Sequence, residues 1–419
     1  MQIGDADRAH GFEDRPLRKF LTDYRRRIGL AVVALGLAAG VWRFGHGQAV
    51  ADHTYDPAAI TDRWMFQPPV GHRTEHPILL AFQRDWGQPS GDDRAIAPGA
   101  WKARMTALCG LAKLGPAVIP VLLDALDAES DEVRDLAAQA SGYFGDRSIL
   151  DRLKRTIRED PSAVVRVYAS IAIGSIAGDL PQELARDILR HDPHAVVRAR
   201  LELALSRGEP IGDHTTRDRL ASYDLALMDT ARVGAAAPDF VLSDLSGKPC
   251  RLSDFRGKKS VALVFIYGAP CMFCTGHLAN MRSKLDEFEA LGTKVLVVEA
   301  NEPYRVRATA RAASIPAQGD PRLPILFDSA HTVAATYGVA MQMNHVEWLN
   351  RPSTFLIDRQ GIIRKAFLAK SPDDRPSSAD LVNEVRAMGD ELTVAKVANP
   401  PAAIGAPDPL RGRAAIDPT

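Results

Sequence analysis

The sequence predicts a multidomain protein in which an α-solenoid of helical repeats precedes an α/β domain with a central mixed sheet. The first observation behind this prediction is the dipeptide Val-Arg, which begins at positions 133, 165 and 197 and so recurs every 32 residues. The second is the change after Val233, where apolar runs of strand length alternate with segments of helical spacing. The chain has 419 residues, which is enough for two or three cores of ordinary size.

We expect six segments along the chain. In order they are a signal peptide or N-terminal membrane anchor, an irregular linker, the helical repeats, a connecting helix, the α/β domain and a disordered tail rich in Pro and Ala, at residues 1–51, 52–99, 100–208, 209–232, 233–392 and 393–419.

Composition excludes some classes of function. Lys and Arg together number 52, as do Asp and Glu, so the chain has no net charge with which to attract nucleic acid. Four cysteines are too few for a disulfide framework, but Cys271 and Cys274 stand only two residues apart. We therefore predict no nucleic-acid partner and look for chemistry at this cysteine pair.

An uncharged stretch, residues 28–42, follows a basic segment that ends in three arginines. As a helix it would be roughly 22 Å long, which is short for a bilayer core of roughly 30 Å but suits a signal sequence. Ala49-Val50-Ala51 fits a cleavage site, and without cleavage residues 28–42 would anchor the chain with its basic end in the cytoplasm. Both versions predict an exported protein, periplasmic or otherwise extracytoplasmic. The alternative is a short buried helix of a soluble domain.

The 32-residue units share apolar stripes at helical spacing. The stripes consist of Val133, Leu136, Ala137 and Ala140, then Val165, Tyr168, Ala169 and Ala172, then Val197, Leu201 and Ala204. In the third unit Arg200 lies on the stripe, as we expect of a helix near the end of a stack. Asp160-Pro161 and Asp192-Pro193 predict an N-cap followed by proline at the first helical position. First helices are expected at 149–158 and 180–190, and a weaker unit at 101–115.

Together with Gly142-Tyr143-Phe144-Gly145-Asp146, these units resemble the short HEAT-like repeats of the phycobiliprotein-lyase type over residues 100–208. The resemblance implies a curved solenoid whose concave face binds a protein partner. From the residues alone, a plain helical spacer is an equal alternative. We expect residues 213–232 to form one amphipathic helix that closes the solenoid.

Strands and helices alternate in the last part of the chain. The predicted order is strand, helix, strand, helix, strand, turn, strand and helix, at 260–267, 272–291, 294–299, 330–337, 354–357, 358–361, 362–367 and 378–388. The cysteine pair follows the first long strand directly. Reactive groups of α/β sheets are exposed at such strand ends.

A cysteine at the start of a helix meets unpaired backbone N–H groups and the positive end of the helix dipole, both of which stabilise a thiolate. A second cysteine one turn later can attack the mixed disulfide that the first one forms. Cys271 and Cys274 can therefore cycle between dithiol and disulfide. The alternatives are a zinc site that includes His277 and a buried structural pair. Cys109 and Cys250 are expected to be small buried residues, with Cys250 as a resolving thiol the alternative.

Several ordered motifs make residues 233–390 resemble the redoxin branch of the thioredoxin superfamily, which includes the alkyl hydroperoxide reductase/thiol-specific antioxidant proteins and the thioredoxin-like reductases. They are Ala237-Pro238-Asp239-Phe240, Leu252-Ser253-Asp254-Phe255-Arg256-Gly257-Lys258, the strand that ends at Gly268, the cysteine pair, and Pro352-Ser353-Thr354-Phe355-Leu356-Ile357-Asp358. The resemblance implies that Pro352 is a cis-proline packed against the cysteines and acts in catalysis with them.

The resemblance leaves the branch open. Cys274 falls where peroxiredoxins keep their peroxidatic cysteine, and Cys271 where they keep a threonine. Tyr267 replaces the proline of that loop, and Arg351 only neighbours the position of the peroxiredoxin arginine. These departures favour dithiol exchange, although Pro270 replaces the tryptophan that usually precedes the pair in reductases.

We therefore predict an exported thiol oxidoreductase that acts on disulfides or hydroperoxides, takes electrons from a thiol donor and uses no cofactor. Its catalytic residues are Cys271, Cys274 and Pro352. In the peroxidase version, Cys274 becomes a sulfenic acid with which Cys271 condenses. The alternative is a binding module that holds copper(I) through the soft ligands of Met341-x-Met343-x-His345.

Overall fold

A computed structural model describes residues 71–86, 100–176, 182–205, 216–268, 271–343, 347–371 and 373–398. All described residues belong to one compact unit, Met65–Thr419. The predicted signal or anchor segment and the tail from residue 399 lie outside the described residues.

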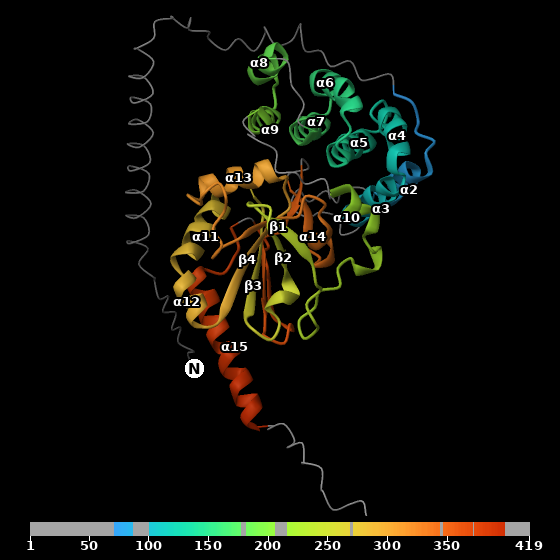
Figure 1. Cartoon of the computed structure of the whole chain (residues 1–419). Coiled ribbons are helices and arrows are strands. Elements are labelled where there is room, and N and C mark those ends of the chain that lie inside the picture. The colour runs from blue at the N-terminus through green and yellow to red at the C-terminus, as the bar shows by residue number, and fades with distance from the viewer. Residues whose placement is uncertain are drawn as a thin grey trace, which may run out of the picture. The chain divides into compact units, whose positions relative to one another are not determined.

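The repeats are pairs of antiparallel helices arranged in two rows (Figure 1). The helices α5 (Asp131–Phe144), α7 (Ala163–Ile176) and α9 (Ala195–Leu205) pack on one another in succession and form the inner row. The outer row contains α4 (Val118–Ala125), α6 (Leu150–Glu159) and α8 (Gln182–His191). The predicted apolar stripes are buried in the inner row, as the helical spacing requires.

Glycines allow the inner helices to approach closely. A Cβ atom at Gly142 of α5 would lie 3.0 Å from the Cα of Ala172 in α7. One at Gly174 of α7 would lie 2.9 Å from the Cβ of Ala204 in α9. Because a Cβ contact of 3.0 Å is unusually short and one of 2.9 Å is essentially never seen, a larger residue at either glycine would push neighbouring repeats apart.

The Val-Arg repeat has a structural cause. Arg166 is buried, and its Nε and Nη2 donate to the carboxylate of Asp192 at 2.8 and 3.1 Å. Its Nη1 donates to the carbonyls of Asp160 and Pro161. Arg134 makes the same bonds one repeat earlier, with Asp160 as its carboxylate. Each arginine thus satisfies its donors across 26 residues and ties one repeat to the next.

The predicted N-caps at Asp160 and Asp192 are wrong. Asp160 ends α6 as its C-cap, and α7 begins only at Ala163. The Asp160 carboxylate accepts bonds from Arg134 and from the backbone N–H of Ser162, so it supports the turn between the helices. Asp192 does the same before α9 through the N–H of His194. These aspartates therefore pair with buried guanidinium groups and do not cap the helices that follow them.

Two connecting segments also differ from expectation. The single helix predicted for 213–232 ends at Ser222 as α10 (Thr216–Ser222), and Asp224 caps a separate turn, η4 (Leu225–Leu227). The segment 52–99, expected to be irregular, contains the helix α2 (Pro77–Asp85), which buries Leu79 and Phe82. Nine residues are too few for a helical period to stand out in the sequence. The helix α3 (Ala100–Lys113) follows as the first unit of the repeats.

The α/β domain contains a seven-stranded mixed sheet of order β2-β1-β5-β4-β3-β8-β9. These strands are, in chain order, β1 (Val241–Asp244), β2 (Pro249–Arg251), β3 (Ser260–Ile266), β4 (Thr293–Glu299), β5 (Ile325–Phe327), β8 (Ser353–Ile357) and β9 (Ile363–Leu368). The central β3 pairs parallel with β4 and antiparallel with β8. The predicted mixed sheet is confirmed, and its middle strand is the one that precedes the cysteine pair.

Helices cover one face of the sheet, where residues of β3 and β4 pack against α11 (Met272–Ser283), α12 (Leu285–Ala290), α13 (Pro303–Ala312) and α15 (Ser378–Ala398) (Figure 1). The opposite face of β3, with Leu263 and Phe265, shares one apolar cluster with α14 (Thr332–Thr336) and with the repeats. The helix predicted for 272–291 is broken at Lys284, and the last helix extends beyond the predicted Met388.

A separate hairpin, β6 (Ala340–Met343) and β7 (Glu347–Asn350), connects the two parts of the described chain. Arg200 of α9 is buried, and its Nε donates to Glu347 of β7 at 2.6 Å. The helix α9 is the last helix of the inner row, as we expect near the end of a stack, and Arg200 on its stripe is buried. It is buried because the α/β domain continues where the repeats stop.

No single helix within the described ranges is long and apolar enough to cross a membrane. The bent pair Trp101–Lys113 and Gly115–Ala125 meets the criterion only when the two helices are counted together.

We predict that Arg166→Met lowers the free energy of unfolding by about 3–5 kcal/mol, because it leaves the buried carboxylate of Asp192 without its partner. Arg155→Met, on the exposed side of α6, is the matched control and should change it by less than about 0.5 kcal/mol. Urea unfolding of both variants measures the difference. Arg134 with Asp160 and Arg166 with Asp192 form what we call the arginine ladder. Equal stabilities would show that this ladder does not hold the repeats together.

Candidate active site

Cys271 lies at the N-cap of α11, directly after the loop that leaves β3. Its Sγ accepts a hydrogen bond from the backbone N–H of Cys274 at 3.3 Å. The sulfur thus takes the place of the Ser or Asp oxygen that usually caps a helix. The sequence prediction of a cysteine at a helix start describes this geometry.

The surroundings of Cys271 favour the thiolate. Its pKa is lowered to about 6, first by the hydrogen bond from the Cys274 thiol and then by backbone N–H groups and the charge of Arg375, while partial burial acts in the opposite direction. At neutral pH, Cys271 is therefore ionised. A half-buried thiolate at a helix start is a competent nucleophile.

Cys274 has the opposite character. Its side chain is fully buried, and its pKa is raised because the thiol donates to Cys271 and because burial disfavours the charge. Cys274 therefore remains a thiol while Cys271 reacts. The structure thus distinguishes a partly accessible thiolate, Cys271, from a buried thiol, Cys274.

Arg375 is a site residue that the sequence analysis missed. It lies in the loop between β9 and α15, and its Nη1 is 3.7 Å from the Sγ of Cys274. Its positive charge lowers the pKa of both cysteines. The residue is 101 positions from Cys274 in the chain, and nothing in its local sequence indicates the contact.

Glu299 is a second missed residue, at the end of β4 beside the end of β3. Its carboxyl is fully buried, its Oε1 accepts bonds from Asn301 and Thr309, and its Oε2 has no hydrogen-bond partner. Burial raises its pKa to about 7, against the hydrogen bonds from Asn301 and Thr309, which lower it. The carboxyl can therefore gain or lose a proton near neutral pH.

Gly268 separates the Glu299 carboxyl from the cysteines. It has φ 95°, and a Cβ atom there would lie 2.4 Å from the Oε1 of Glu299. The Gly268 backbone also hydrogen-bonds Cys274 and lowers the pKa of that thiol. Only glycine fits this backbone conformation and this close approach.

The zinc alternative has no support in the described part of the chain, where no three His, Cys, Asp or Glu side chains form a group able to hold a metal ion. His277 is buried one turn after Cys274. Its pKa is lowered to about 4, first by burial and then by Arg375, so the imidazole is neutral.

Pro352 lies where the sheet brings it toward the cysteine loop. The next residue, Ser353, pairs with Phe265 near the end of β3, and the carbonyl of Pro352 accepts a bond from Ala369. Its role beside the cysteines stays a prediction. Arg351 is directed elsewhere, because its guanidinium donates to the carbonyls of Ala369 and Leu368.

The other cysteines are distant from this chemistry. Cys109 is buried, and burial raises its pKa to about 11. Cys250 lies on the edge strand β2, four strand spacings from β3, or roughly 19 Å, which does not suit a resolving thiol. Of the copper ligands considered above, His345 and the side chains of Met341 and Met343 lie outside the described residues.

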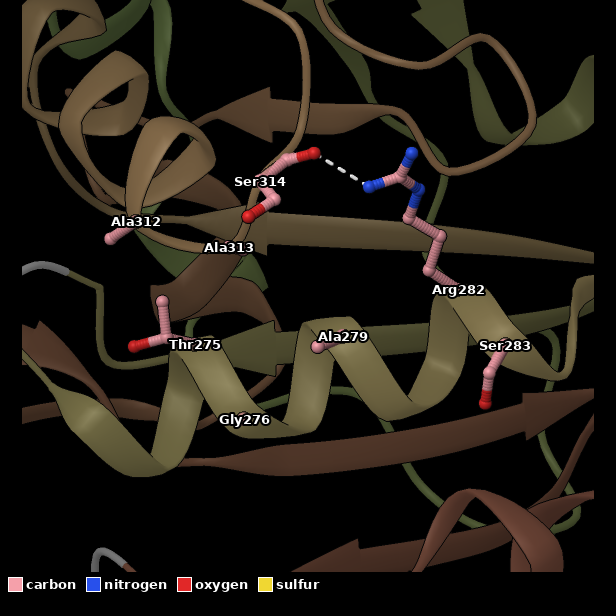
Figure 2. Close-up of a pocket in the computed structure, with 8 residues that line it drawn as sticks. All are labelled: Thr275, Gly276, Ala279, Arg282, Ser283, Ala312, Ala313 and Ser314. Carbon is pink, nitrogen blue, oxygen red and sulfur yellow. Dashed lines mark hydrogen bonds between the residues drawn. The ribbon is translucent and has the colours of Figure 1, made fainter. Parts of the chain in front are cut away.

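Apolar side chains and a shallow groove lie beside the cysteine pair. Met272 and Phe273, between the two cysteines, are 70% and 48% exposed. A groove of about 580 Å³ runs along α11 from Thr275 to Ser283 and is closed on its other side by residues 312–314. Figure 2 shows Arg282 bridging this groove through its bond to the carbonyl of Ser314.

Both parts of the described chain are similar to known proteins. Residues 233–366 match the AhpC/TSA family, and residues 119–206 match HEAT repeats. The chain is 35% identical over 134 residues to the thiol-disulfide oxidoreductase ResA of Geobacillus thermodenitrificans, a match that covers 32% of this chain and 67% of the relative. It is also 35% identical over 144 residues to the alkyl hydroperoxide reductase E of Mycobacterium tuberculosis, which covers 34% and 88%.

Solved structures with some likeness include the peroxidoxin BcpB of Mycobacterium tuberculosis, with 25% identity and a TM-score of 0.32 over 38% of this chain and 98% of that one. The reduced 2-Cys peroxiredoxin of Plasmodium vivax gives 19% identity and a TM-score of 0.34 over 39% and 84%.

We predict that alkylation of Cys271 by iodoacetamide accelerates through a pH of about 6, where its thiolate forms. Cys274→Ala removes the largest stabilising contact and should move this midpoint to a higher pH, and Arg375→Met should move it in the same direction by less. Mass spectrometry of the Cys271 peptide measures the rate. Arg386→Met, on the exposed side of α15, should leave the midpoint in place. An unchanged midpoint in Cys274→Ala would contradict the assignment of Cys274 as donor.

Proposed function

The chain belongs to the AhpC/TSA family through residues 233–366 and is a thiol-dependent redox enzyme, and we propose that it exchanges disulfides with its substrate. Cys271 would attack and Cys274 would resolve. The observation that carries this proposal is the difference between the two thiols. Cys271 has a pKa of about 6 and is partly accessible, whereas Cys274 is buried and protonated.

The first step is attack by the Cys271 thiolate on one sulfur of a substrate disulfide. The substrate S–S bond breaks, its second sulfur leaves as a thiolate, and a mixed disulfide forms on Cys271. Cys274 then loses its proton and attacks the Cys271 sulfur, which releases the second substrate thiol. The substrate gains two electrons, the pair becomes a disulfide, and a thiol donor must reduce the pair again.

Glu299 is the group that we assign to receive the proton of Cys274. The thiol is buried, so its proton cannot pass directly to water, and the carboxyl lies across Gly268 with one oxygen unpaired. A pKa of about 7 matches a group that gains and loses a proton at neutral pH. Arg375 would stabilise the thiolate that forms on Cys274.

Hydroperoxide reduction is the second candidate, and the likeness to alkyl hydroperoxide reductase E favours it. A thiolate attacks the peroxide oxygen, the O–O bond breaks, and a sulfenic acid and an alcohol form. The other cysteine then condenses with the sulfenic acid and releases water. The burial of Cys274 makes Cys271 the better attacking group, although alignment with peroxiredoxins would select Cys274.

We also propose that the protein acts outside the cytoplasm, because residues 28–42 with their basic flank have the character of a signal or anchor. The exposed pair Met272 and Phe273 favours a protein substrate, since apolar side chains around a nucleophile bind peptide surfaces better than small polar molecules. The repeats would additionally bind a protein partner. The outer helices are available for it, since the inner ones contact the α/β domain.

We predict that Cys271→Ser abolishes disulfide reduction, because it removes the attacking sulfur. In Cys274→Ser, Cys271 should still attack the substrate, but the mixed disulfide should not be resolved. Mass spectrometry should then show the protein with the substrate attached. Both variants are assayed with a protein disulfide and with a hydroperoxide, and Cys250→Ser is the control. Loss of hydroperoxide consumption in Cys274→Ser alone would replace this assignment by the peroxidase in which Cys274 attacks.

We predict that Glu299→Gln slows resolution of the mixed disulfide on the order of 100-fold, since the amide cannot accept a proton. In the wild type, resolution should accelerate as the pH rises through about 7, where the carboxyl ionises, and this acceleration should vanish in the variant. Glu287→Gln, on the exposed side of α12, is the matched control. A retained pH dependence in Glu299→Gln would assign the proton to another group.

A further inference from the structure

The inner helices of the repeats and the α/β domain form a buried junction at the hairpin β6–β7. We propose that the α/β domain is the partner of the inner helices and that Arg200 of α9, through Glu347, positions the loop before Cys271. The inference rests on the proposed function, because it assigns the repeats a role in holding that redox site.

Glu347 stands between two arginines from different parts of the chain. Arg200 contributes its Nε and Nη2 from the repeats, at 2.6 and 2.5 Å. Arg305 of α13 donates its Nη2 at 3.3 Å and also binds Glu302 at 3.1 Å. All these side chains are buried. Removing one of these arginines would leave part of the buried charge of Glu347 unpaired, which lowers the stability of the folded protein strongly.

Trp348, the neighbour of Glu347, makes the second contact. Its backbone N–H donates to the hydroxyl of Tyr168 in α7 at 2.9 Å. Its ring lies 5.2 Å from the guanidinium carbon of Arg104, which is also surrounded by the rings of Phe82, Trp86 and Tyr168. Arg104 in turn donates to Gln139 and Asp135 of α5. Two repeat helices, α3 through Arg104 and α7 through Tyr168, therefore contact one tryptophan of the α/β domain, and α5 binds the Arg104 guanidinium.

The helix α13 makes the third contact. A Cβ atom at Gly174 of α7 would lie 2.8 Å from the hydroxyl oxygen of Tyr304, so this repeat glycine accommodates the tyrosine. The repeats and one face of the sheet also share one apolar cluster. Buried charges, aromatic rings and apolar side chains together make this surface resemble the interior of one domain.

The junction continues to the redox pair through α13. One turn beyond Arg305, Thr309 donates its hydroxyl to the Oε1 of Glu299 at 3.0 Å, and Glu299 lies against Gly268. Tyr267, the residue before Gly268, is affected electrostatically by Glu347, Arg200 and Cys271. Arg200 is thus a positioning residue that acts on the loop through Glu347 and α13.

The experiment compares Arg200→Met with Arg198→Met in the full chain. Both residues lie in α9, but Arg198 donates to the carbonyl of Asp192 within the repeats. We expect Arg200→Met to accelerate backbone hydrogen exchange in the Tyr267–Gly268 loop and in α13 by about tenfold or more. We also expect it to slow alkylation of Cys271 at neutral pH severalfold. Arg198→Met should change neither the hydrogen exchange nor the alkylation rate. Arg200→Lys, which keeps the positive charge, should show smaller changes in both than Arg200→Met.

Glu347→Gln tests the same contact from the other side and should have the same effects on the loop, should Arg200→Met fail to fold. If both Arg200→Met and Glu347→Gln match Arg198→Met in exchange and alkylation, the proposal is overturned. Alkylation requires no turnover, so that outcome would leave the cysteine and glutamate assignments intact. Loss of substrate reduction with unchanged exchange and alkylation would likewise overturn it.

Discussion

A buried guanidinium must satisfy its donors, and this requirement organises the whole helical part of the molecule. Arg134 and Arg166 meet it with a carboxylate 26 residues later and with carbonyls in the turn just before their own helix. In the third repeat Arg198 holds the equivalent position and donates to the carbonyl of Asp192. Arg200, two residues later in the same helix, is also buried and takes its carboxylate from Glu347 of the α/β domain, so a buried arginine–carboxylate pair also joins the repeats to the redox domain.

The chemistry of the site likewise depends on which groups donate hydrogen bonds to the Cys271 sulfur. One helix start supplies the N–H groups that stabilise Cys271, and the Cys274 thiol adds its own hydrogen bond. The same bond keeps the proton on Cys274. The two sulfurs thus differ because Cys271 lies at the helix cap and Cys274 lies one turn inside the helix. In the proposed reaction, Arg375 stabilises the thiolate and Glu299 receives the proton of Cys274.

Sequence reasoning was effective wherever a pattern is local. The repeat period, the apolar stripes, the central strand and the cysteine at a helix start all depend on residues within one or two turns of each other. It failed where a distant residue decides. Asp-Pro before an apolar run fits an N-cap, and only the position of Arg134 in space shows that Asp160 serves as its carboxylate. Arg375 and Glu299 reach the site through the sheet topology, and their own neighbours in the chain do not indicate this.

The helix predicted for residues 213–232 failed for a related reason. Its apolar residues continue at helical spacing, but the hydroxyl of Tyr223 bonds to Thr336 and Asp224 caps a new turn. Arg200 illustrates the reverse case. A charged residue on an apolar stripe indicated a helix near the end of the stack, but the sequence did not indicate that Glu347 of the α/β domain would pair with it there.

The arginine ladder also limits how the length of this chain can vary. Each arginine and its aspartate are 26 residues apart, and the interval contains the rest of one inner helix and the whole of one outer helix. A residue inserted into either helix would rotate everything after it by about 100° and remove the carboxylate from the guanidinium. Insertions and deletions are therefore compatible with the stack only in the turns between the helices.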